Sequence, residues 1–166
     1  VPAKLLLDTL RNLPEQPVTF KVDADTFGSE LITANGRYKL SGENPIDFPK
    51  IPSVNRAFSV ELSSVALSHA ISNTIFATSS DDLRPTMTGV YFLFEDNKAT
   101  FVATDAHKLV KYSHNITNES VSASFIMPKK ALNLLKSSLA SSPDVRISFN
   151  KSNAFFTFGN FQMACR

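Results

Sequence analysis

A threonine, an aspartate and a histidine within four residues are the side chains of this sequence best suited to catalysis. Thr104, Asp105 and His107 could form a hydrolytic site in which a carboxylate orients an imidazole that activates a hydroxyl. However, side chains two apart on a strand point the same way, whereas a catalytic pair needs converging side chains and an oxyanion site. The sequence contains no GxSxG, HExxH or glycine-rich phosphate loop. A structural turn is therefore the better interpretation, and a hydrolase that uses His107 and Asp105 is the weaker alternative.

Metal and disulfide chemistry have no support in the sequence either. His69 and His114 lack the spacing of metal ligands, and Cys165 is the only cysteine, which excludes an internal disulfide and CxxC zinc sites. We expect no cofactor and no metal. No apolar run is long enough to span a bilayer, and one cysteine suits a reducing compartment, so we expect a cytoplasmic protein without a membrane partner. The formal net charge of +2 is too small to indicate a partner by itself.

The elements that must position these residues contain an internal repeat. Residues 1–22 and 127–149 each hold an apolar residue, a proline, a basic amphipathic helix, a second proline and an alternating strand. A repeat at this spacing predicts tandem copies of one supersecondary unit. We also expect the chain to begin part-way through a unit, because the residues before the second copy have no counterpart before Val1.

The repeat predicts one helix over residues 3–13 and its second copy over residues 129–139. Each has leucines at helical spacing on one side and basic residues elsewhere on its surface. The basic residues are Lys4 and Arg11 on the first helix, and Lys129, Lys130 and Lys136 on the second. Such faces are ordinarily solvated surfaces. The alternative is a channel around duplex DNA, where positive side chains neutralise phosphates without reading bases. The recurrence of the basic face in both copies favours the channel.

A further helix is predicted over residues 63–76, capped by Ser63 or Ser64. We expect its buried side to consist of Val65, Leu67, Ala70, Ile71 and Ile75. This helix carries no lysine or arginine, so its contribution to the electrostatics of a channel is open.

The rest of the pattern is rich in strands. Alternating or apolar segments predict strands at 18–22, 29–33, 37–40, 58–62, 89–94, 99–103, 109–113, 122–126, 145–149, 154–158 and 161–165. Asn35 and Gly36 form a strong hairpin signal. Three prolines within residues 41–54 indicate an extended linker, so we place a domain boundary there, between a domain at 1–54 and a second at 55–166. The order of elements predicts an α+β fold of mostly antiparallel sheet with helices on one face.

Five short segments carry a family resemblance. Residues 100–109 read TFVATDAHKL, and VPAK at 1–4, DFP at 47–49, DLR at 82–84 and IMPKK at 126–130 stand in order around them. They resemble the VATDGHRL, VPAR, DFP, DVR and VPRK motifs of the bacterial sliding clamp, the beta subunit of DNA polymerase III. The resemblance covers the whole chain and implies three similar domains per subunit. Residues 1–54 would be the C-terminal half of the first domain plus a linker, and residues 55–166 the middle domain.

The resemblance implies a non-catalytic, homodimeric ring that encircles duplex DNA of any sequence and tethers the replicative polymerase. It also implies a surface pocket for short linear motifs of polymerases, the clamp loader and repair proteins. The matching positions are Arg84, Met87, Thr104, Ala106, His107, Lys108 and Leu109. Ala106 stands where the family usually has glycine, and its methyl group would restrict the backbone or the approach of a peptide. The rest of the pocket would belong to a third domain.

The contact between clamp subunits would use the predicted strand at 37–40. The resemblance places Arg37, Tyr38 and Leu40 in the head-to-tail contact that closes the ring. The ordinary alternative is that Tyr38 and Leu40 face the interior of their own domain. For the whole chain, the remaining alternative is an α+β peptide-binding module without a DNA role.

Overall fold

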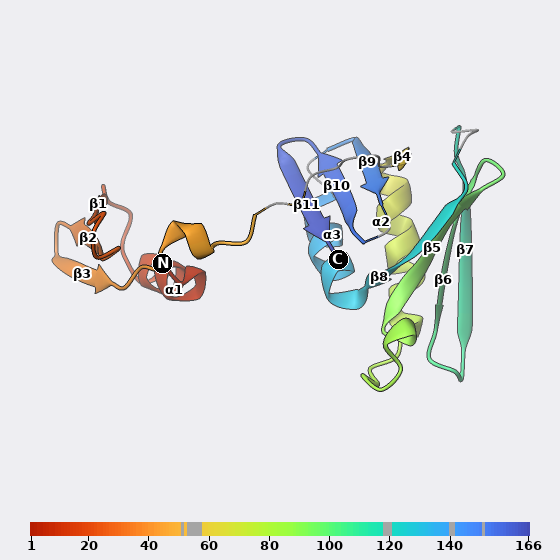
Figure 1. The fold of residues 1–166 in the computed structure, drawn as a ribbon, viewed down its shortest axis with the longest axis horizontal. Coiled ribbons are helices and arrows are strands. Elements are labelled where there is room, and N and C mark those ends of the chain that lie inside the picture. The colour runs from red at the N-terminus through yellow and green to blue at the C-terminus, as the bar shows by residue number, and fades with distance from the viewer. Residues whose placement is uncertain (51, 53–57, 118–120, 140–141, 151) are drawn as a thin grey trace. The chain divides into compact units, whose positions relative to one another are not determined.

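The computed structural model describes residues 1–50, 52, 58–117, 121–139, 142–150 and 152–166. The chain divides into two compact units, Val1–Lys50 and Ile51–Arg166 (Figure 1). Among the described residues, we find no helix with the length and apolar character that crossing a membrane requires.

The first unit is a helix followed by a three-stranded antiparallel meander. Its elements are α1 (Ala3–Arg11), β1 (Thr19–Val22), β2 (Ser29–Thr33), β3 (Gly36–Leu40) and a 3-10 turn η1 (Pro45–Asp47). The strands lie in the order β1-β2-β3, and Leu31 at the centre of β2 is fully buried. The expected hairpin forms with Ala34 and Asn35 as its two loop residues, because Thr33 pairs with Gly36.

Two expectations for the first unit are wrong. All four residues of β1 are exposed, although an alternating strand was expected to be half-buried, because no second sheet packs on it within the described residues of this unit. The linker is not purely extended. Pro45 favours the start of a turn, and the Asn44 side chain accepts a hydrogen bond from the Ile46 N–H, which caps η1.

The described residues of the second unit form two α-helices and two four-stranded antiparallel sheets. Its elements are β4 (Phe58–Ser63), α2 (Ser64–Ser72), η2 (Ile75–Ala77), η3 (Pro85–Met87), β5 (Gly89–Glu95), β6 (Lys98–Thr104), β7 (Leu109–Asn115), β8 (Ala123–Pro128), α3 (Lys129–Ser138), β9 (Asp144–Phe149), β10 (Ala154–Phe158) and β11 (Phe161–Cys165). The strand orders are β11-β10-β9-β4 and β7-β6-β5-β8, so the strands form two sheets where one was expected. The α+β class is confirmed.

The two sheets arise because the halves of this unit exchange strands. Each half runs strand, helix, three-stranded meander, as β4-α2-β5-β6-β7 and then β8-α3-β9-β10-β11. The first strand of each half pairs with the meander of the other, β4 with β9 and β8 with β5. With α1 and β1 to β3, the helix-and-meander pattern therefore occurs three times, once more than the sequence repeat indicated. The sequence repeat does not include the copy with α2, because this helix lacks the flanking proline and the lysines of the other two.

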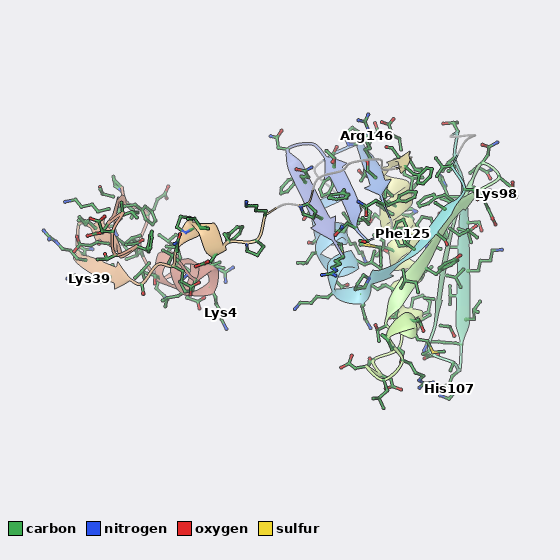
Figure 2. All side chains as sticks on the ribbon, in the orientation of Figure 1. Lys4, Lys39, Lys98, His107, Phe125 and Arg146 are labelled. Carbon is green, nitrogen blue, oxygen red and sulfur yellow. The ribbon has the colours of Figure 1, made fainter. Side chains whose placement is uncertain are left out.

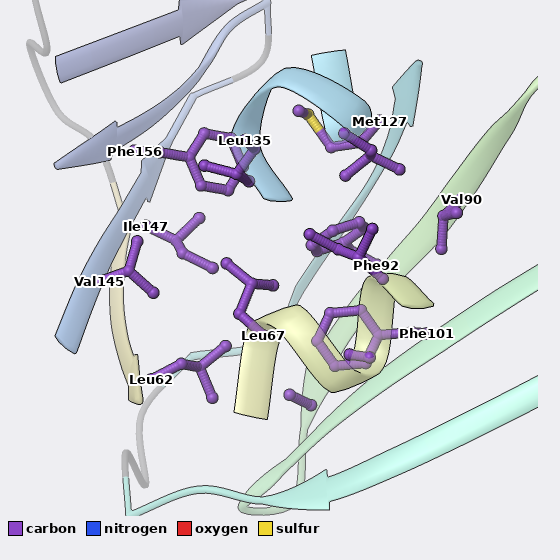
Figure 3. Packing of buried hydrophobic residues seen from close by; sticks show 14 of the residues in the cluster. Leu62, Leu67, Val90, Phe92, Phe101, Met127, Leu135, Val145, Ile147 and Phe156 are labelled. Atoms are coloured by element: carbon purple, nitrogen blue, oxygen red, sulfur yellow. The ribbon is translucent and has the colours of Figure 1, made fainter. Parts of the chain in front are cut away.

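One apolar core joins both sheets and both helices of the second unit. The Phe92 ring packs edge-on against Phe101 at 4.7 Å and stacks on Phe125 at 5.2 Å, between ring centroids. Phe94 and Phe149 stack at 5.7 Å and connect β5 of one sheet to β9 of the other. Figure 3 shows Leu67 of α2 between side chains of the two sheets. Aromatic contacts of this kind add to the free energy gained by removing the rings from water.

The expected helix over residues 63–76 is wrong in its extent, because α2 ends at Ser72 and Ile75 lies partly buried in η2. The expected burial of Val65 is also wrong. Val65 is 64% exposed, whereas α2 buries Ser64, Ala66, Leu67, Ala70 and Ile71. Residues two apart on a helix lie about 200° around the axis from each other, so Val65 faces away when Leu67 faces the core. The helix begins where expected, because the Ser63 Oγ accepts a hydrogen bond from the Ala66 N–H.

Candidate functional site

Helix α3 presents a positively charged surface beside the core. Leu132 and Leu135 are fully buried and fix the helix on the sheets. Lys130 and Lys136 are exposed and Lys129 is partly exposed. The helix contains no acidic residue, and no ion pair between described residues involves these three lysines. The surface is therefore ready to neutralise an anion.

The positions of Lys129 and Lys130 are unfavourable for the helix itself, whereas Lys136 lies in the last turn, where the helix dipole favours a cation. Lys129 and Lys130 are the first two residues of α3, and Pro128 before them offers no side-chain cap. A cation near a helix N-terminus opposes the helix dipole and costs roughly 0.3–1 kcal/mol at low salt. Helix α1 repeats the pattern, with Pro2 as its uncapped start and Lys4 in its first turn. Helix stability does not explain these first-turn lysines, and an anion bound against them would.

A hollow of about 400 Å3 adjoins the start of α3. It is lined by Ser79, Ser80, Asp82, Thr88, Pro128, Lys129, Lys130 and Asn133. The N–H of Lys129 donates to the Thr88 carbonyl at 3.2 Å, which ties the helix to the loop before β5. Ammonium, hydroxyl and amide groups around such a hollow can hold a phosphate, and the Asp82 carboxylate at the same place opposes it.

The remaining candidate DNA-facing residues lie on α1 in the first unit. Lys4 and Arg11 are exposed there, and Asp8 on the same helix offsets part of their charge. That the basic residues of α1 and α3 share one concave side stays a prediction.

The candidate peptide-binding residues come to one end of the sheet β7-β6-β5-β8. At this end β5 begins beside the last residue of β8, and β6 ends beside the first residue of β7. Met87 precedes β5 in η3, Thr104 closes β6, and Leu109 opens β7 with 67% of its surface exposed. Figure 2 shows His107 at this end of the sheet and Lys98 at the opposite end.

The chain between β6 and β7 is a tightly bonded turn, which agrees with the structural turn predicted for Thr104, Asp105 and His107. The Asp105 carboxylate accepts hydrogen bonds from the N–H groups of His107 (3.1 Å) and Lys108 (3.0 Å) and forms an ion pair with the Lys108 ammonium. The hydrogen bond from the Lys108 side chain, above all, holds the pKa of Asp105 far below its usual value. Because this carboxylate binds Lys108 and the main chain, the hydrolytic reading has no residue to orient the imidazole.

Ala106 adopts a left-handed backbone conformation, with φ of 76°. An alanine there costs roughly 1 kcal/mol more than a glycine, because its Cβ approaches the following carbonyl. The Thr104 Oγ1 accepts from the Ala106 N–H at 3.1 Å and donates to the Lys108 carbonyl at 2.8 Å. Thus the neighbours of Ala106 hold a conformation that its side chain disfavours.

The loop before η3 contains a residue that sequence reasoning missed. The Asp81 carboxylate accepts from the Leu83 N–H at 3.0 Å and from the Arg84 Nε at 2.8 Å. The hydrogen bond from the Arg84 side chain, more than that from the Leu83 N–H, lowers the pKa of Asp81. Leu83 at the tip is 91% exposed. An acid three residues before Arg84 was the available signal, but the motif at 82–84 drew attention to Asp82 instead.

The candidate interface residues of β3 differ in exposure. Arg37 and Tyr38 are exposed, whereas Leu40 is only 6% exposed and pairs with the buried Ser29. Leu40 thus faces the interior of its own unit. Within the described residues of the first unit, β3 has a paired strand on one side only, and such an edge can receive a strand of another chain.

Metal chemistry finds no place in the described part of the chain. No three side chains of His, Cys, Asp or Glu gather there as a metal site would require. Cys165 is partly buried, and this burial raises the pKa of its thiol.

Comparisons with known proteins agree on one family. The model of the "DNA polymerase III beta subunit, central domain" matches residues 61–166. The beta sliding clamps of Staphylococcus epidermidis and Staphylococcus aureus are 30% and 29% identical to the chain over 167 residues. Each match covers the whole chain but 44% of the relative, so the chain spans less than half the length of these proteins.

Solved structures with a similar fold carry the same description. A putative DNA polymerase III beta subunit from Eubacterium rectale is 29% identical with a TM-score of 0.88, over 100% of this chain and 46% of that one. The DnaN sliding clamp of Bartonella birtlesii, bound to griselimycin, is 28% identical with a TM-score of 0.85, over 99% and 45%. The Bacillus subtilis sliding clamp, at 23% identity and a TM-score of 0.88 over 99% and 43%, shares the fold.

Proposed function

Because this chain belongs to the family of bacterial sliding clamps, the beta subunits of DNA polymerase III, we propose that it is part of a ring that encircles duplex DNA and tethers a polymerase. The observation that carries this proposal is the basic surface of α3, of which Lys129 and Lys130 occupy first-turn positions that the helix dipole disfavours. The role is topological, and the clamp itself makes or breaks no bond. Its gain is effective concentration, since a tethered polymerase rebinds its template before it diffuses away.

The proposed contact with DNA is electrostatic and independent of sequence. Lysines of α3 neutralise phosphates, which recur along every duplex, so the protein can slide. Lys4 and Arg11 of α1 contribute in the same way from residues 1–54, which we assign to the first clamp domain. Helix α2, in the middle domain at 55–166, has no lysine or arginine, and its polar side chains are those of Ser64, Ser68, His69 and Ser72.

The end of the sheet that carries the 105–108 turn is the proposed docking site for short linear motifs of polymerases, the clamp loader and repair proteins. Met87 and Leu109 supply apolar contact, and methionine adapts to varied ligands. Thr104, His107 and Lys108 bind the extended main chain of the peptide. Griselimycin is bound to the Bartonella clamp, and we choose it as the compound with which binding at this site is tested. A third domain would complete the pocket, so this chain should bind more weakly than a full subunit.

The edge of β3 is the proposed contact with a second clamp subunit. Arg37 and Tyr38 present their side chains there, and the buried Leu40 supports the strand from inside. A head-to-tail ring also needs a complementary surface, which we assign to the third domain.

The test of the DNA role is binding to duplexes of unrelated sequence. At low salt, we expect the 166-residue chain to bind two 20-base-pair duplexes of equal length and different sequence with dissociation constants that agree within about twofold, and affinity should fall steeply as salt rises. Fluorescence anisotropy measures both quantities. No binding at low salt would favour the peptide-binding module without a DNA role, and a strong preference for one sequence would contradict a sliding contact.

A further inference from the structure

Two loops at the proposed peptide site are held by the same arrangement of side chains. In each loop an aspartate accepts a hydrogen bond from the N–H two residues ahead and binds the cationic side chain three residues ahead. The pairs are Asp81 with Arg84 and Asp105 with Lys108. We call this arrangement the aspartate bridge.

The aspartate bridge of Asp81 fixes the loop that leads into η3. The Asp81 N–H donates to the Ser79 Oγ at 3.0 Å, and the Ser79 N–H donates to the Met87 carbonyl at 2.8 Å. The loop is thereby closed at its base beside Met87 and stiffened at its tip beside Leu83. The Arg84 guanidinium is fixed through its Nε.

The aspartate bridge of Asp105 fixes the turn between β6 and β7. The Asp105 side chain is 20% exposed, so it lies beneath the turn, while the Lys108 side chain is 48% exposed. Ala106 lies inside this turn in a strained left-handed conformation, and such strain persists only where the surroundings impose it. A glycine would need no such restraint. The turn of this chain therefore needs the restraint from Asp105 because position 106 is an alanine.

We propose that Asp81 and Asp105 are positioning residues of the peptide site, which hold its two loops in their binding arrangement without touching the ligand. This inference rests on the proposed peptide-binding function. A ligand that meets fixed loops does not have to order them, and that saving appears as affinity. Without the aspartate bridges, Arg84, Lys108 and the main chain around Ala106 sample several arrangements, and the ligand must select one.

The test uses asparagine at each position in the 166-residue chain, with griselimycin as the probe. Asparagine loses the bond to the cation, and its neutral amide oxygen accepts the main-chain hydrogen bonds more weakly than the carboxylate does, so the restraint on the loop is reduced. We expect D105N and D81N each to weaken griselimycin binding roughly tenfold, as measured by 15N NMR titration. The amide signals of His107 and Lys108 should also shift in free D105N. The control D96N removes the same charge at the opposite end of the sheet, where Asp96 already has a positive φ that asparagine tolerates.

A second variant separates positioning from general stability. Glycine at 106 makes the left-handed conformation accessible without restraint, so D105N should lose less affinity in the A106G background than in the wild type. A general loss of stability would be the same in both backgrounds. Thermal unfolding followed by circular dichroism should show that D105N and D96N are both fully folded at the temperature of the titration.

The outcomes separate the two levels of the argument. If the wild-type chain binds griselimycin and D105N and D81N bind as tightly as D96N, the positioning role is wrong and the peptide site stands. If D105N loses as much griselimycin affinity in the A106G background as in the wild type, the link between the aspartate bridge of Asp105 and the strain at Ala106 is wrong. If the wild type does not bind griselimycin at residues 104–109, the proposed peptide site fails, and the positioning role fails with it.

Discussion

Replacing Lys129, Lys130 and Lys136 together by glutamine should weaken binding to duplex DNA by about 10²-fold at low salt. Each lysine that neutralises a phosphate releases condensed counterions, and the slope of log K against log salt changes by about 0.9 per contact. At about 50 mM salt one such contact is worth close to tenfold in affinity, so two to three contacts give the expected loss. The salt slope of the variant should be shallower by about 2 to 3. Anisotropy titration over a salt series measures both.

The control for this variant removes the same charge elsewhere. Glutamine at Lys39, Lys98 and Lys111 also lowers the formal net charge from +2 to −1, since three positive charges are lost. These lysines lie on strands β3, β6 and β7. We expect the control to bind within about threefold of the wild type. Equal loss in both variants would mean that only net charge matters and would contradict a DNA-binding surface on α3.

Phe92→Ala should lower the free energy of unfolding of the second unit by about 3–5 kcal/mol. Phe92 is fully buried on β5 and contacts the rings of Phe94, Phe101 and Phe125. Its removal leaves a cavity among these rings, which lie on β5, β6 and β8 of one sheet, and these strands cannot close it without breaking their pairing. The sequence contains no tryptophan, so denaturant unfolding is best followed by far-UV circular dichroism.

The matched control is Phe161→Ala on the edge strand β11. Phe161 is 51% exposed and stacks on Phe158 at a centroid distance of 5.5 Å, so its loss should cost about 1 kcal/mol. If Phe92→Ala cost no more than Phe161→Ala, the core would not be organised around Phe92.

Local sequence patterns predicted most of the elements, because each helix and strand has an apolar period that shows in a short window. They could not predict that β4 and β8 exchange partners. β4 pairs with β9 across 81 to 91 residues and β8 pairs with β5 across 29 to 39 residues, and pairing over such separations depends on the packing of the finished core and has no local signal. The burial of Val65 was misjudged for a related reason. The apolar residues of α2 surround much of the helix, so the pattern does not identify the side that faces the core.

The candidate site, too, could be predicted from the sequence only in part. Antiparallel strand order was enough to bring Met87, Thr104 and Leu109 to one end of a sheet, and the family resemblance had proposed these positions as part of the peptide site. The roles of Asp81 and Asp105 depend on turns whose geometry is set by hydrogen bonds and by the left-handed Ala106. An alanine gives no local signal for that conformation. Similarly, the alternation in β3 did not distinguish the exposed Tyr38 from the buried Leu40, because both lie two residues apart on one strand.

The central claim is that the first and last turns of α3 touch the phosphates of DNA, and 15N NMR titration of the chain with a short duplex tests it most directly. We predict that the amide signals of Lys129, Lys130 and Lys136 shift together with those of Lys4 and Arg11, that a duplex of another sequence shifts the same signals, and that added salt reverses the shifts. Shifts that gather on β6, β7 or the 105–108 turn while the signals of α3 stay in place would contradict the claim.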